Sequence, residues 1–338
     1  MSYKREIILN NFQELFFNKF GTNLDSIIEL KADASERKIY RLFTNGNSFI
    51  GIYNNNIKEN IAFINFTNTF VRLGFNVPII INISGDNLYY IEDDLGDMTL
   101  FKFSAESAKI DLNNYYKKAL ADLIKFQVNA KEEIDYSYCY QTKAFNPEVL
   151  MYDFKKFNEY FNNIFLKNKL DDEVINNTFL DLAAIISKAE NHFFLYRDFQ
   201  PRNIMIKNNE LYYIDYQSGR RGPLQYDVAS FLYSGSISLI DEERNALIDY
   251  YLKEINKIMK CAEDEFRYYF YYFAFARIIQ VLGAYGYQYK TRNDNEMIKK
   301  IYKAVNNLKS LENKIVDHDI NDFIKKIADS FGNESTIS

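Results

Sequence analysis

The most constraining feature of this 338-residue chain is a short polar segment between apolar runs near residue 200. The polar segment YRDFQPRN, at residues 196–203, directly follows the apolar residues 193–195. Two short apolar runs come next, at residues 204–207 and 211–214, and the Asn208-Asn209 pair between them is a typical turn. The pattern predicts a loop, then a β-hairpin, then an aspartate, Asp215, where the second strand ends.

Three polar side chains in this segment have the spacing of a phosphoryl-transfer site. Asp198 and Asn203 are separated by four residues, and Asp215 follows Asn203 by twelve. Transfer from a Mg-nucleotide needs one carboxylate to orient the attacking hydroxyl, and amide and carboxylate oxygens to hold the metal. The alternative is an exposed turn, since Asp and Asn are common turn formers. The apolar flanks favour a functional site held between buried strands.

Composition narrows the classes of function. Apolar residues make up 47% of the chain and charged residues 26%, as in ordinary folded proteins, and the net charge of -5 argues against nucleic acid or an anionic membrane as a partner. Cys139 and Cys261 are far apart and fit reduced core thiols, while only two histidines argue against a His-based metal site or catalytic triad. No apolar run approaches a membrane span, and charges interrupt residues 1–20. We therefore expect a cytoplasmic protein without a signal peptide.

The first part of the chain reads as a small sheet with helices. Apolar residues at helical spacing predict an opening helix that Gly21 ends, and a second helix is expected at about residues 58–73. Turn residues separate the apolar runs that we interpret as strands. The strands are expected at about residues 29–30, 39–44, 49–53, 77–83 and 88–91.

After an acidic segment at residues 92–96 the pattern becomes helical. Helices are expected at about residues 104–131, 146–168, 171–190, 223–235, 241–259, 263–288, 294–313 and 319–331. The sequence thus predicts an α+β fold with two lobes, a small N-terminal β-sheet lobe at residues 1–95 and a larger helical C-terminal lobe at residues 96–338. This is the protein-kinase-like plan, in which ATP lies between the lobes with its adenine against the hinge backbone, here Glu92, Asp93, Asp94 and Leu95.

Several blocks of the sequence resemble the aminoglycoside phosphotransferase and choline kinase-like superfamily. That superfamily usually carries H-x-D-x4-N followed by an I-D-[FY] metal-binding strand, and the closest resemblance within it is to the anomeric N-acetylmuramate/N-acetylglucosamine kinases. A late stretch with Arg277, Gln280 and VLG is also similar. The other blocks are DASERKIYR at 33–41, EDDLGD at 92–97, RDFQPRN at 197–203, IDYQ at 214–217, GP at 222–223 and YD at 226–227.

The resemblance implies roles for the catalytic segment. Asp198 would accept or orient the proton of the substrate hydroxyl, while Asn203 and Asp215 would bind Mg2+. Gln200 would hydrogen-bond the transferring phosphoryl group, or else pack against the loop. Asp227, in a helix that Pro223 opens, would hold the catalytic loop through backbone hydrogen bonds.

Nucleotide contacts are expected from the N-terminal part. By the resemblance, Ser35 and its neighbouring amides would cradle the β-phosphate, although on spacing alone a plain β-turn is the better explanation. The strand at 48–53 has no lysine for the phosphates. Arg37, Lys38 or Lys58 could supply that charge, with Glu59 as an ion-pair partner.

Substrate contacts are expected in the C-terminal part. Arg220 and Arg221 either form a solvated pair or meet an anionic group of the substrate or phosphate. Arg277, Gln280 and Tyr285 are candidate substrate contacts, because tyrosine rings and hydroxyls suit sugar recognition. Most other aromatic residues between 266 and 289 must belong to the core.

Together these features predict an ATP- and Mg2+-dependent enzyme that phosphorylates a hydroxyl of a small molecule, most plausibly a sugar or amino sugar. An aminoglycoside antibiotic phosphotransferase is the alternative within the enzyme class. An inactive nucleotide-binding pseudokinase or scaffold is a third possibility, because Tyr196 replaces the usual histidine and the strand lysine is absent. A protein kinase is disfavoured, since the glycine-rich loop and A-P-E segment are missing.

Overall fold

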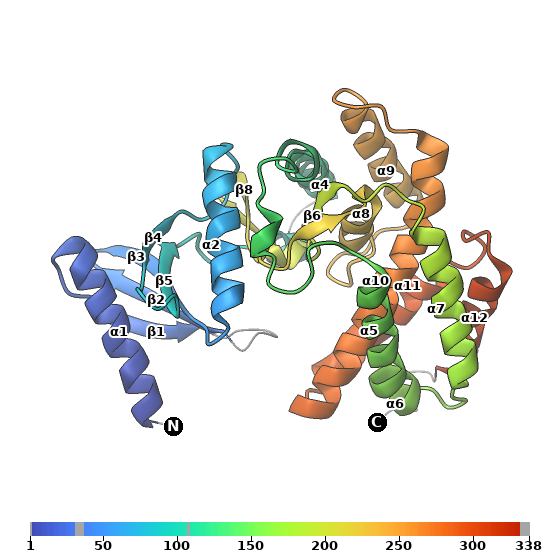
Figure 1. The fold of residues 1–338 in the computed structure, drawn as a ribbon, viewed down its shortest axis with the longest axis horizontal. Helices are drawn as coiled ribbons and strands as arrows, with labels where there is room; N and C mark the ends of the chain where they lie inside the picture. The colour runs from blue at the N-terminus through green and yellow to red at the C-terminus, as the bar shows by residue number, and fades with distance from the viewer. Residues whose placement is uncertain (1, 31–36, 107–108, 332–338) are drawn as a thin grey trace. The chain divides into compact units, whose positions relative to one another are not determined.

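The computed structural model describes residues 2–30, 37–106 and 109–331 of the chain (Figure 1). The chain forms two compact units, each assembled from separate segments. The first comprises Met1–Glu106, Glu132–Lys143 and Arg202–Gly219, and the second Ser107–Lys131, Ala144–Pro201 and Arg220–Ser338. The units are discontinuous in sequence, so the division at residue 95 stays a prediction.

The first unit is built on a five-stranded antiparallel sheet with strand order β1-β2-β3-β5-β4. Asn45 and Gly46, at the β2–β3 turn, both have positive φ, as the tight two-residue hairpin turns of twisted strands require. The strands are β1 (Ser26–Leu30), β2 (Lys38–Thr44), β3 (Asn47–Tyr53), β4 (Ile80–Ile83) and β5 (Tyr89–Asp93). These are the predicted strands, with ends shifted by a few residues.

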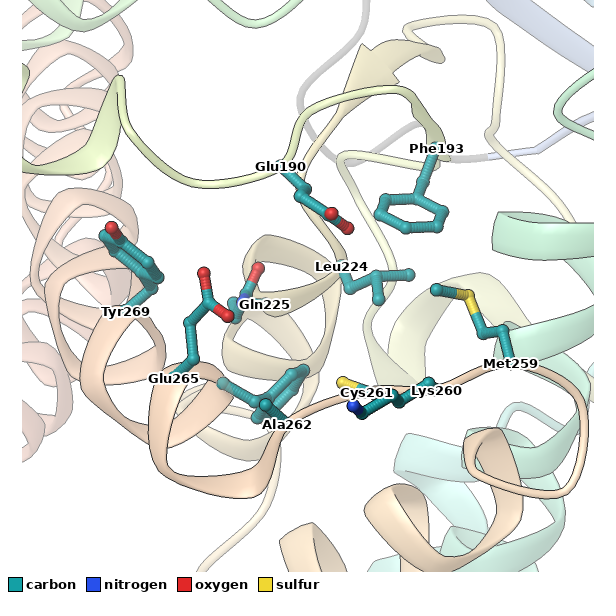
Figure 2. Close-up of a pocket in the computed structure, with 11 residues that line it drawn as sticks. Glu190, Phe193, Leu224, Gln225, Met259, Lys260, Cys261, Ala262, Glu265 and Tyr269 are labelled. Atoms are coloured by element: carbon teal, nitrogen blue, oxygen red, sulfur yellow. The ribbon is translucent and has the colours of Figure 1, made fainter.

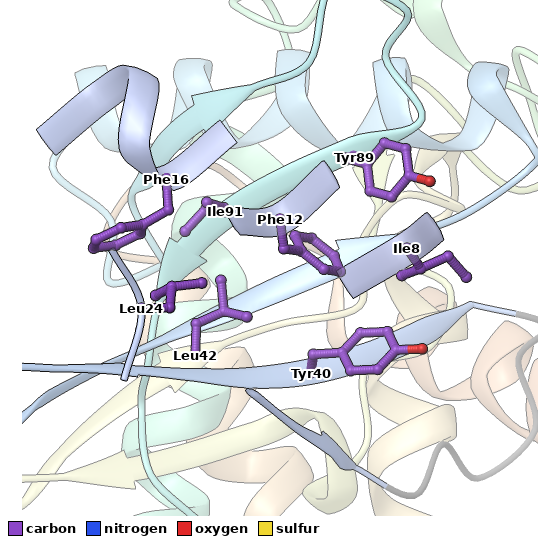
Figure 3. Close-up of a cluster of buried hydrophobic side chains, with 8 residues drawn as sticks. All are labelled: Ile8, Phe12, Phe16, Leu24, Tyr40, Leu42, Tyr89 and Ile91. Carbon is purple, nitrogen blue, oxygen red and sulfur yellow. The ribbon is translucent and has the colours of Figure 1, made fainter. Parts of the chain in front are cut away.

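Helices cover both faces of this sheet (Figure 1). Helix α1 (Ser2–Phe20) buries Ile8, Phe12 and Phe16 at four-residue spacing, which is one face of a helix. Gly51 makes this close packing possible, because a Cβ there would lie 2.8 Å from the Phe12 ring. The cluster in Figure 3 comprises Ile8, Phe12, Phe16, Leu24, Tyr40, Leu42, Tyr89 and Ile91.

Helix α2 (Ile57–Arg72) lies on the opposite face and begins at Asn56, whose side chain accepts a hydrogen bond from the Glu59 backbone N–H. Side chains alternate along β5, so Tyr90 points away from α1 and stacks on Phe63 of α2 with ring centroids 5.4 Å apart. This alternation places Tyr90 and Glu92 on the α2 face of the sheet.

The first unit also contains the predicted hairpin after the catalytic loop, together with α3 (Leu100–Glu106). Strands β7 (Ile204–Lys207) and β8 (Glu210–Tyr213) pair antiparallel across two asparagines that both have positive φ. The Ile206 N–H donates to Met98 O at 2.8 Å, and the Tyr213 N–H donates to Asn76 O at 2.9 Å. The hairpin prediction is confirmed.

The second unit is mainly helical. A short antiparallel pair, β6 (Phe193–Leu195) with β9 (Arg220–Gly222), leads into the catalytic loop; β9 was not predicted. Gly283 lets α10 approach α5, because a Cβ there would lie 2.7 Å from Phe157 N. The helices are α4 (Lys109–Ile124), α5 (Pro147–Phe157), α6 (Asn163–Phe165), α7 (Asp172–Ile186), α8 (Leu224–Leu232), α9 (Asp241–Ile255), α10 (Glu263–Arg292), α11 (Glu296–Lys309) and α12 (His318–Ser330).

Two helices predicted as continuous change their winding. The helix predicted at 104–131 ends its regular α-turns at Ile124 and continues as a π-helical turn, Lys125–Asn129. In this turn Gln127 donates to Leu224 O at 3.0 Å and accepts from the Tyr251 hydroxyl at 2.6 Å. A second π-turn, Asn158–Asn162, lies within the predicted helix at 146–168. No described helix has the length and apolar character needed to cross a membrane.

Candidate active site

The loop that carries Asp198 is held by its backbone. The Tyr196 and Arg197 N–H groups donate to the two carboxylate oxygens of Asp227 at 2.7 and 2.8 Å, which confirms the role expected for Asp227. Arg197 has φ of 76°, a left-handed conformation that is costly for a side-chain-bearing residue, so these bonds stabilise a strained turn. Burial raises the pKa of Asp227 to about 7.

Tyr196 fills the motif position usually held by histidine. Its side chain is fully buried and makes edge-on contacts with Phe126 and Phe199, with ring centroids 5.6 and 5.3 Å away. An aromatic ring therefore packs where the motif histidine would lie. The change at Tyr196 leaves a closely packed loop.

Asp198 forms an ion pair within the second unit. Arg277 of α10 donates to Asp198 Oδ1 at 3.2 Å and also to Gln280 Oε1. Arg277 is buried, so it interacts with Asp198 away from most solvent. The structure thus brings together three of the predicted site residues, Asp198, Arg277 and Gln280.

A further carboxylate in this region was missed by the sequence analysis. Asp153 of α5 is buried, and burial raises its pKa to about 6, against the opposing effects of Arg197, Arg277, Lys156 and Arg220. The signal was present, because Asp153 falls on the same helical face as buried apolar residues of α5. An acid on a buried helix face needs a partner, and here several cations surround it.

Arg220 and Arg221 do not form a solvated pair. Arg220 in β9 is only 1% exposed, whereas Arg221 is exposed and its carbonyl accepts from the Phe145 N–H at 2.7 Å. Strand alternation explains the difference, since consecutive side chains point to opposite faces. The interpretation of Arg220 as part of a solvated pair is therefore wrong.

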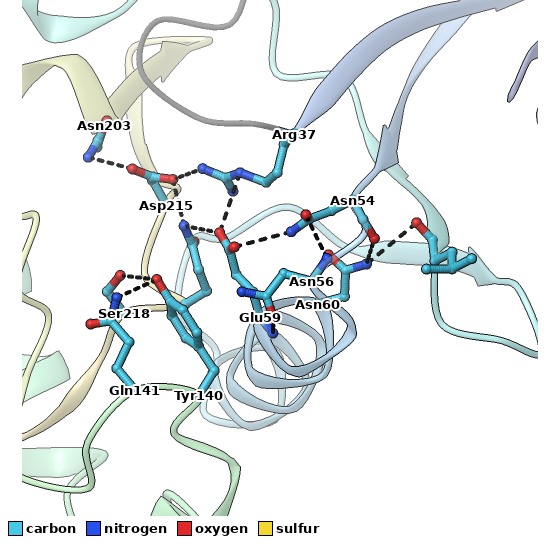
Figure 4. A network of polar contacts seen from close by, with 12 residues as sticks. Arg37, Asn54, Asn56, Glu59, Asn60, Tyr140, Gln141, Asn203, Asp215 and Ser218 are labelled. Carbon is cyan, nitrogen blue, oxygen red and sulfur yellow. Dashed lines mark hydrogen bonds and ion pairs between the residues drawn. The ribbon is translucent and has the colours of Figure 1, made fainter. Parts of the chain in front are cut away.

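In the first unit, Asp215 is the centre of a polar network (Figure 4). Asn203 Nδ2 donates to Asp215 Oδ2 at 3.2 Å, Gln217 Nε2 donates to Oδ1 at 2.9 Å, and Arg37 pairs with Oδ1. Asp215 has φ of 69°, another left-handed residue. Burial opposes ionisation, but the Arg37 guanidinium and these hydrogen bonds hold the pKa of Asp215 below its usual value.

The same network selects among the cations that could replace the missing strand lysine. Arg37 Nε lies 3.6 Å from Glu59 Oε1, and Glu59 also accepts from Gln217 at 3.3 Å and from Asn54 at 3.2 Å. Of the candidates Arg37, Lys38 and Lys58, Arg37 is the one whose side chain meets both Glu59 and Asp215. Glu59 is thus its ion-pair partner, as expected.

Glu92 lies near this network. Burial raises its pKa to about 8, Arg37 opposes that shift and Asp93 adds to it. Its Oε2 is buried and has no hydrogen-bond partner among the described residues. The carboxylates of Glu59 and Asp215 therefore place more negative than positive charge around Arg37, while the raised pKa keeps Glu92 mostly protonated at neutral pH. Asn203 and Asp215 bring hard oxygen donors together beside it, which is the ligand chemistry Mg2+ prefers.

The other predicted hinge residues have mainly structural contacts. Asp94 is paired with Arg41 of β2, whose Nε lies 2.6 Å from Oδ2, and Leu95 is buried. The Asp93 N–H donates to Ile79 O at 3.1 Å. Ser35 lies outside the described residues.

The remaining predicted site residues lie in the second unit. Gln200 is half-buried in the catalytic loop. Tyr285 is half-buried on α10, with Lys300 Nζ 5.8 Å from its ring centroid. Asp198, Gln200 and Tyr285 belong to the second unit, whereas Asn203 and Asp215 belong to the first.

Comparisons with known proteins find similarity to phosphotransferases and kinases. The model of the phosphotransferase enzyme family, APH, matches residues 147–264. The chain is 21% identical to an N-acetylmuramate/N-acetylglucosamine kinase of Neisseria meningitidis over 330 residues, covering 93% of each protein. A kinase of the same name from Pseudomonas aeruginosa is 23% identical over 231 residues, 68% of this chain and 65% of that protein.

Solved structures give the same class of fold. The choline kinase LicA from Streptococcus pneumoniae superposes with a TM-score of 0.61 at 14% identity, covering 91% of this chain and 99% of that one. A putative aminoglycoside phosphotransferase from Ralstonia eutropha gives 0.61 at 9% identity, covering 97% and 99%. The predicted fold class is confirmed: the chain has a protein-kinase-like fold. The family match and the kinase names of the two relatives support the predicted phosphotransferase enzyme that acts on a hydroxyl.

The predicted resemblance to the aminoglycoside phosphotransferase and choline kinase-like superfamily is also confirmed. It extends to the N-acetylmuramate/N-acetylglucosamine kinase branch.

Proposed function

We propose that the protein transfers the γ-phosphoryl group of ATP, bound with Mg2+, to a hydroxyl of a sugar or amino sugar. The observation that carries this proposal is the way Asp198 is held. Asp227 fixes the backbone before it, and Arg277 fixes its carboxylate. A general base must be oriented toward the proton it accepts, and these contacts supply that orientation.

Asn203 and Asp215 are the residues we propose to hold Mg2+. Their side chains are in contact, and the carboxylate of Glu59 adds negative charge nearby. When bound, the ion would neutralise charge on the transferring phosphate. The chain's own contribution is to fix the two ligands, through Gln217 and Arg37, before any nucleotide arrives.

Arg37 supports an active enzyme over a pseudokinase. The missing strand lysine was one of two reasons to consider an inactive protein, beside the change at Tyr196. Arg37 brings a guanidinium into contact with Glu59 and Asp215, so the cluster has the cation that the strand at 48–53 lacks. We propose that this guanidinium contacts nucleotide phosphate, which it can bind in a two-pronged geometry.

We propose the acceptor from the charges around Asp153 and from the names of the two relatives. Both curated relatives are named N-acetylmuramate/N-acetylglucosamine kinases. Around Asp153, the cations Arg197, Arg277, Lys156 and Arg220 would repel a polycationic aminoglycoside, but they would tolerate a neutral or anionic sugar. Gln280 accepts a hydrogen bond from Arg277, which also donates to Asp198, and Gln280 is a proposed sugar contact.

Several predicted residues keep their proposed roles. Gln200 and Tyr285 remain candidates for the phosphoryl group and the sugar. Arg221 is exposed and remains a candidate for an anionic group. Arg220 is buried, so we propose that it supports the site and does not contact the substrate directly.

The test is transfer from radiolabelled ATP to a panel of free sugars, amino sugars, choline analogues and aminoglycosides. We expect a neutral or anionic sugar to give the highest kcat/KM, and Asp198→Asn to suppress that transfer while sugar binding persists. Kanamycin turnover well above that of every sugar would overturn the acceptor assignment. No Mg-dependent transfer to any acceptor would favour the pseudokinase alternative.

A further inference from the structure

The second unit contains a cavity that the proposed reaction does not use. It has a volume of about 280 Å3, near the lower end of the range for small-molecule sites, and is partly open (Figure 2). Its lining comes from the residues before β6, the first turn of α8, the segment before α10, and the first turns of α10. These elements fold together in one unit, so the cavity belongs to that unit alone.

The polar lining is predominantly acidic. Glu190 and Glu265 line the cavity with their carboxylates, and Lys260 is the cation among the lining residues. Burial raises the pKa of the Cys261 thiol to about 11, and the carboxylates of Glu190 and Glu265 add to that shift. Cys261 therefore stays neutral, and the field at this point is negative.

Gln225 gives an independent indication of a ligand. The residue as a whole is 8% exposed and lines the cavity, and its side chain has no hydrogen-bond partner among the residues that the structure describes. Glu190 and Glu265 line the same cavity as Gln225 (Figure 2). An amide that lines a cavity and has no protein partner offers a donor and an acceptor that a ligand in the cavity could use.

The remaining walls are apolar and aromatic. Phe193, Leu224, Met259 and Phe266 line the cavity. Aromatic faces attract ammonium groups but are not metal ligands, and an apolar wall suits a hydrocarbon body. We propose that this cavity binds a small organic ammonium compound, with its cation between Glu190 and Glu265, a hydrogen bond to Gln225, and its apolar part against the aromatic wall.

The cavity is lined in part by β6 and α8, the two elements that hold the catalytic loop. Phe193 begins β6, which runs directly into that loop, and Gln225 lies in α8 two residues before Asp227. Asp227 is the residue that fixes the Tyr196 and Arg197 backbone. A ligand here would touch both supports of the loop without approaching Asp198 through the acceptor site.

The test is calorimetric titration of the full chain at pH 7 without nucleotide or sugar. Phenethylamine represents a free amine, Nα-acetyl-lysine methylamide represents a lysine of a protein partner, and 2-phenylethanol is the neutral counterpart of the first. We expect at least one ammonium compound to bind, and the alcohol to bind at least about tenfold more weakly. Which amine binds identifies the source, and binding of either supports the site.

Variants locate the binding. The double variant Glu190→Gln/Glu265→Gln should weaken the amine about tenfold or more, and Gln225→Leu should weaken it while keeping or raising the Tm, because it removes an unpartnered polar group. Asp264→Asn is the matched control, since Asp264 is exposed in the same first turn of α10 but does not line the cavity.

Three results would overturn the proposal: no binding of either amine, equal binding of the alcohol, or equal losses in Asp264→Asn and the double variant. None of them bears on phosphoryl transfer, which the titration does not involve.

Discussion

In the first unit, the carboxylates of Glu59 and Asp215 gather around the guanidinium of Arg37, and the raised pKa of Glu92 keeps that nearby carboxyl mostly protonated at neutral pH. In the second unit the balance is reversed, because several cations surround the buried Asp153 and one of them pairs with Asp198. One region therefore has a surplus of negative charge and the other a surplus of positive charge.

The difference indicates which ligand each region can accept. A buried surplus of charge is costly unless a counter-charge arrives, so the first cluster favours a cation and the second an anion. This agrees with the proposed division of labour, in which Mg2+ meets Asn203 and Asp215 while phosphoryl or acceptor oxygens meet the Arg277 region. The charge balance of each region also predicts the effect of substitutions there.

The largest effect is expected at the proposed metal ligands. Asp215→Ala or Asn203→Ala should lower kcat by about 1,000-fold or more, because charge neutralisation at the phosphate is worth several kcal/mol. The measurement is Mg-dependent turnover of the best acceptor, with circular dichroism to show an intact fold. Asp215→Asn keeps the shape and removes the charge, so it should be nearly as impaired. Wild-type turnover in these variants would remove both residues from the site.

A somewhat smaller effect is expected at the proposed base. Asp198→Asn should lower kcat by about 100- to 10,000-fold and leave the acceptor Kd within a few-fold, because a base acts in the transition state. Single-turnover kinetics and calorimetric acceptor titration separate the two quantities. Asp181→Asn, on α7 of the same unit, is the control for loss of a carboxylate. A parallel loss of binding and turnover would make Asp198 a substrate-binding residue instead.

Arg37 tests the first cluster directly. Arg37→Ala should raise the KM for MgATP by about tenfold or more, and it should lower the Tm because Glu59 and Asp215 lose their shared counter-charge. Added Mg2+ should restore part of the Tm, since it supplies positive charge to the same carboxylates. If the Tm falls while the KM holds, Arg37 is a structural residue and the phosphates bind elsewhere.

Local pattern predicted much of the fold. The β7–β8 hairpin was found because its two strands flank adjacent turn residues, and α2 because its apolar period runs between clear boundaries. Strand β9 was missed because it is three residues long and pairs with β6 across the whole catalytic segment. The π-turn at Lys125–Asn129 was missed because the partners of Gln127 lie far along the chain.

The residues of the candidate site also divide into those that local sequence pattern could predict and those that it could not. Motif spacing alone singled out Asp198, Asn203 and Asp215, and their catalytic roles remain predictions. The pairing of Arg37 with Asp215 joins residues 178 apart in sequence, so no local pattern could choose it over Lys38 or Lys58. Asp153 was missed for a different reason, since a single acid in an amphipathic helix is usually assigned to the solvent face.

The smallest effect that we predict concerns the pH dependence of stability. Glu92 has a folded-state pKa of about 8, raised from its ordinary value by burial. Its protonated form therefore stabilises the fold fully below the ordinary pKa, and this contribution is lost as the pH rises through about 8. Between pH 6 and pH 9, the Tm of the wild type should fall.

Glu92→Gln keeps the shape of a neutral carboxyl but cannot ionise, so its Tm should fall less over the same interval. At pH 9 the variant should exceed the wild type in stability by more than about 1 kcal/mol, while at pH 5 the two should be similar. Urea unfolding at both pH values measures this, and Glu14→Gln, exposed on α1, is the control. Because Arg37 partly offsets the burial of Glu92, the double variant Arg37→Ala/Glu92→Gln should lose less stability at pH 9 than Arg37→Ala alone. Equal losses would mean that Glu92 does not share the charge of Arg37, and the negative surplus of the first cluster would then rest on Glu59 and Asp215.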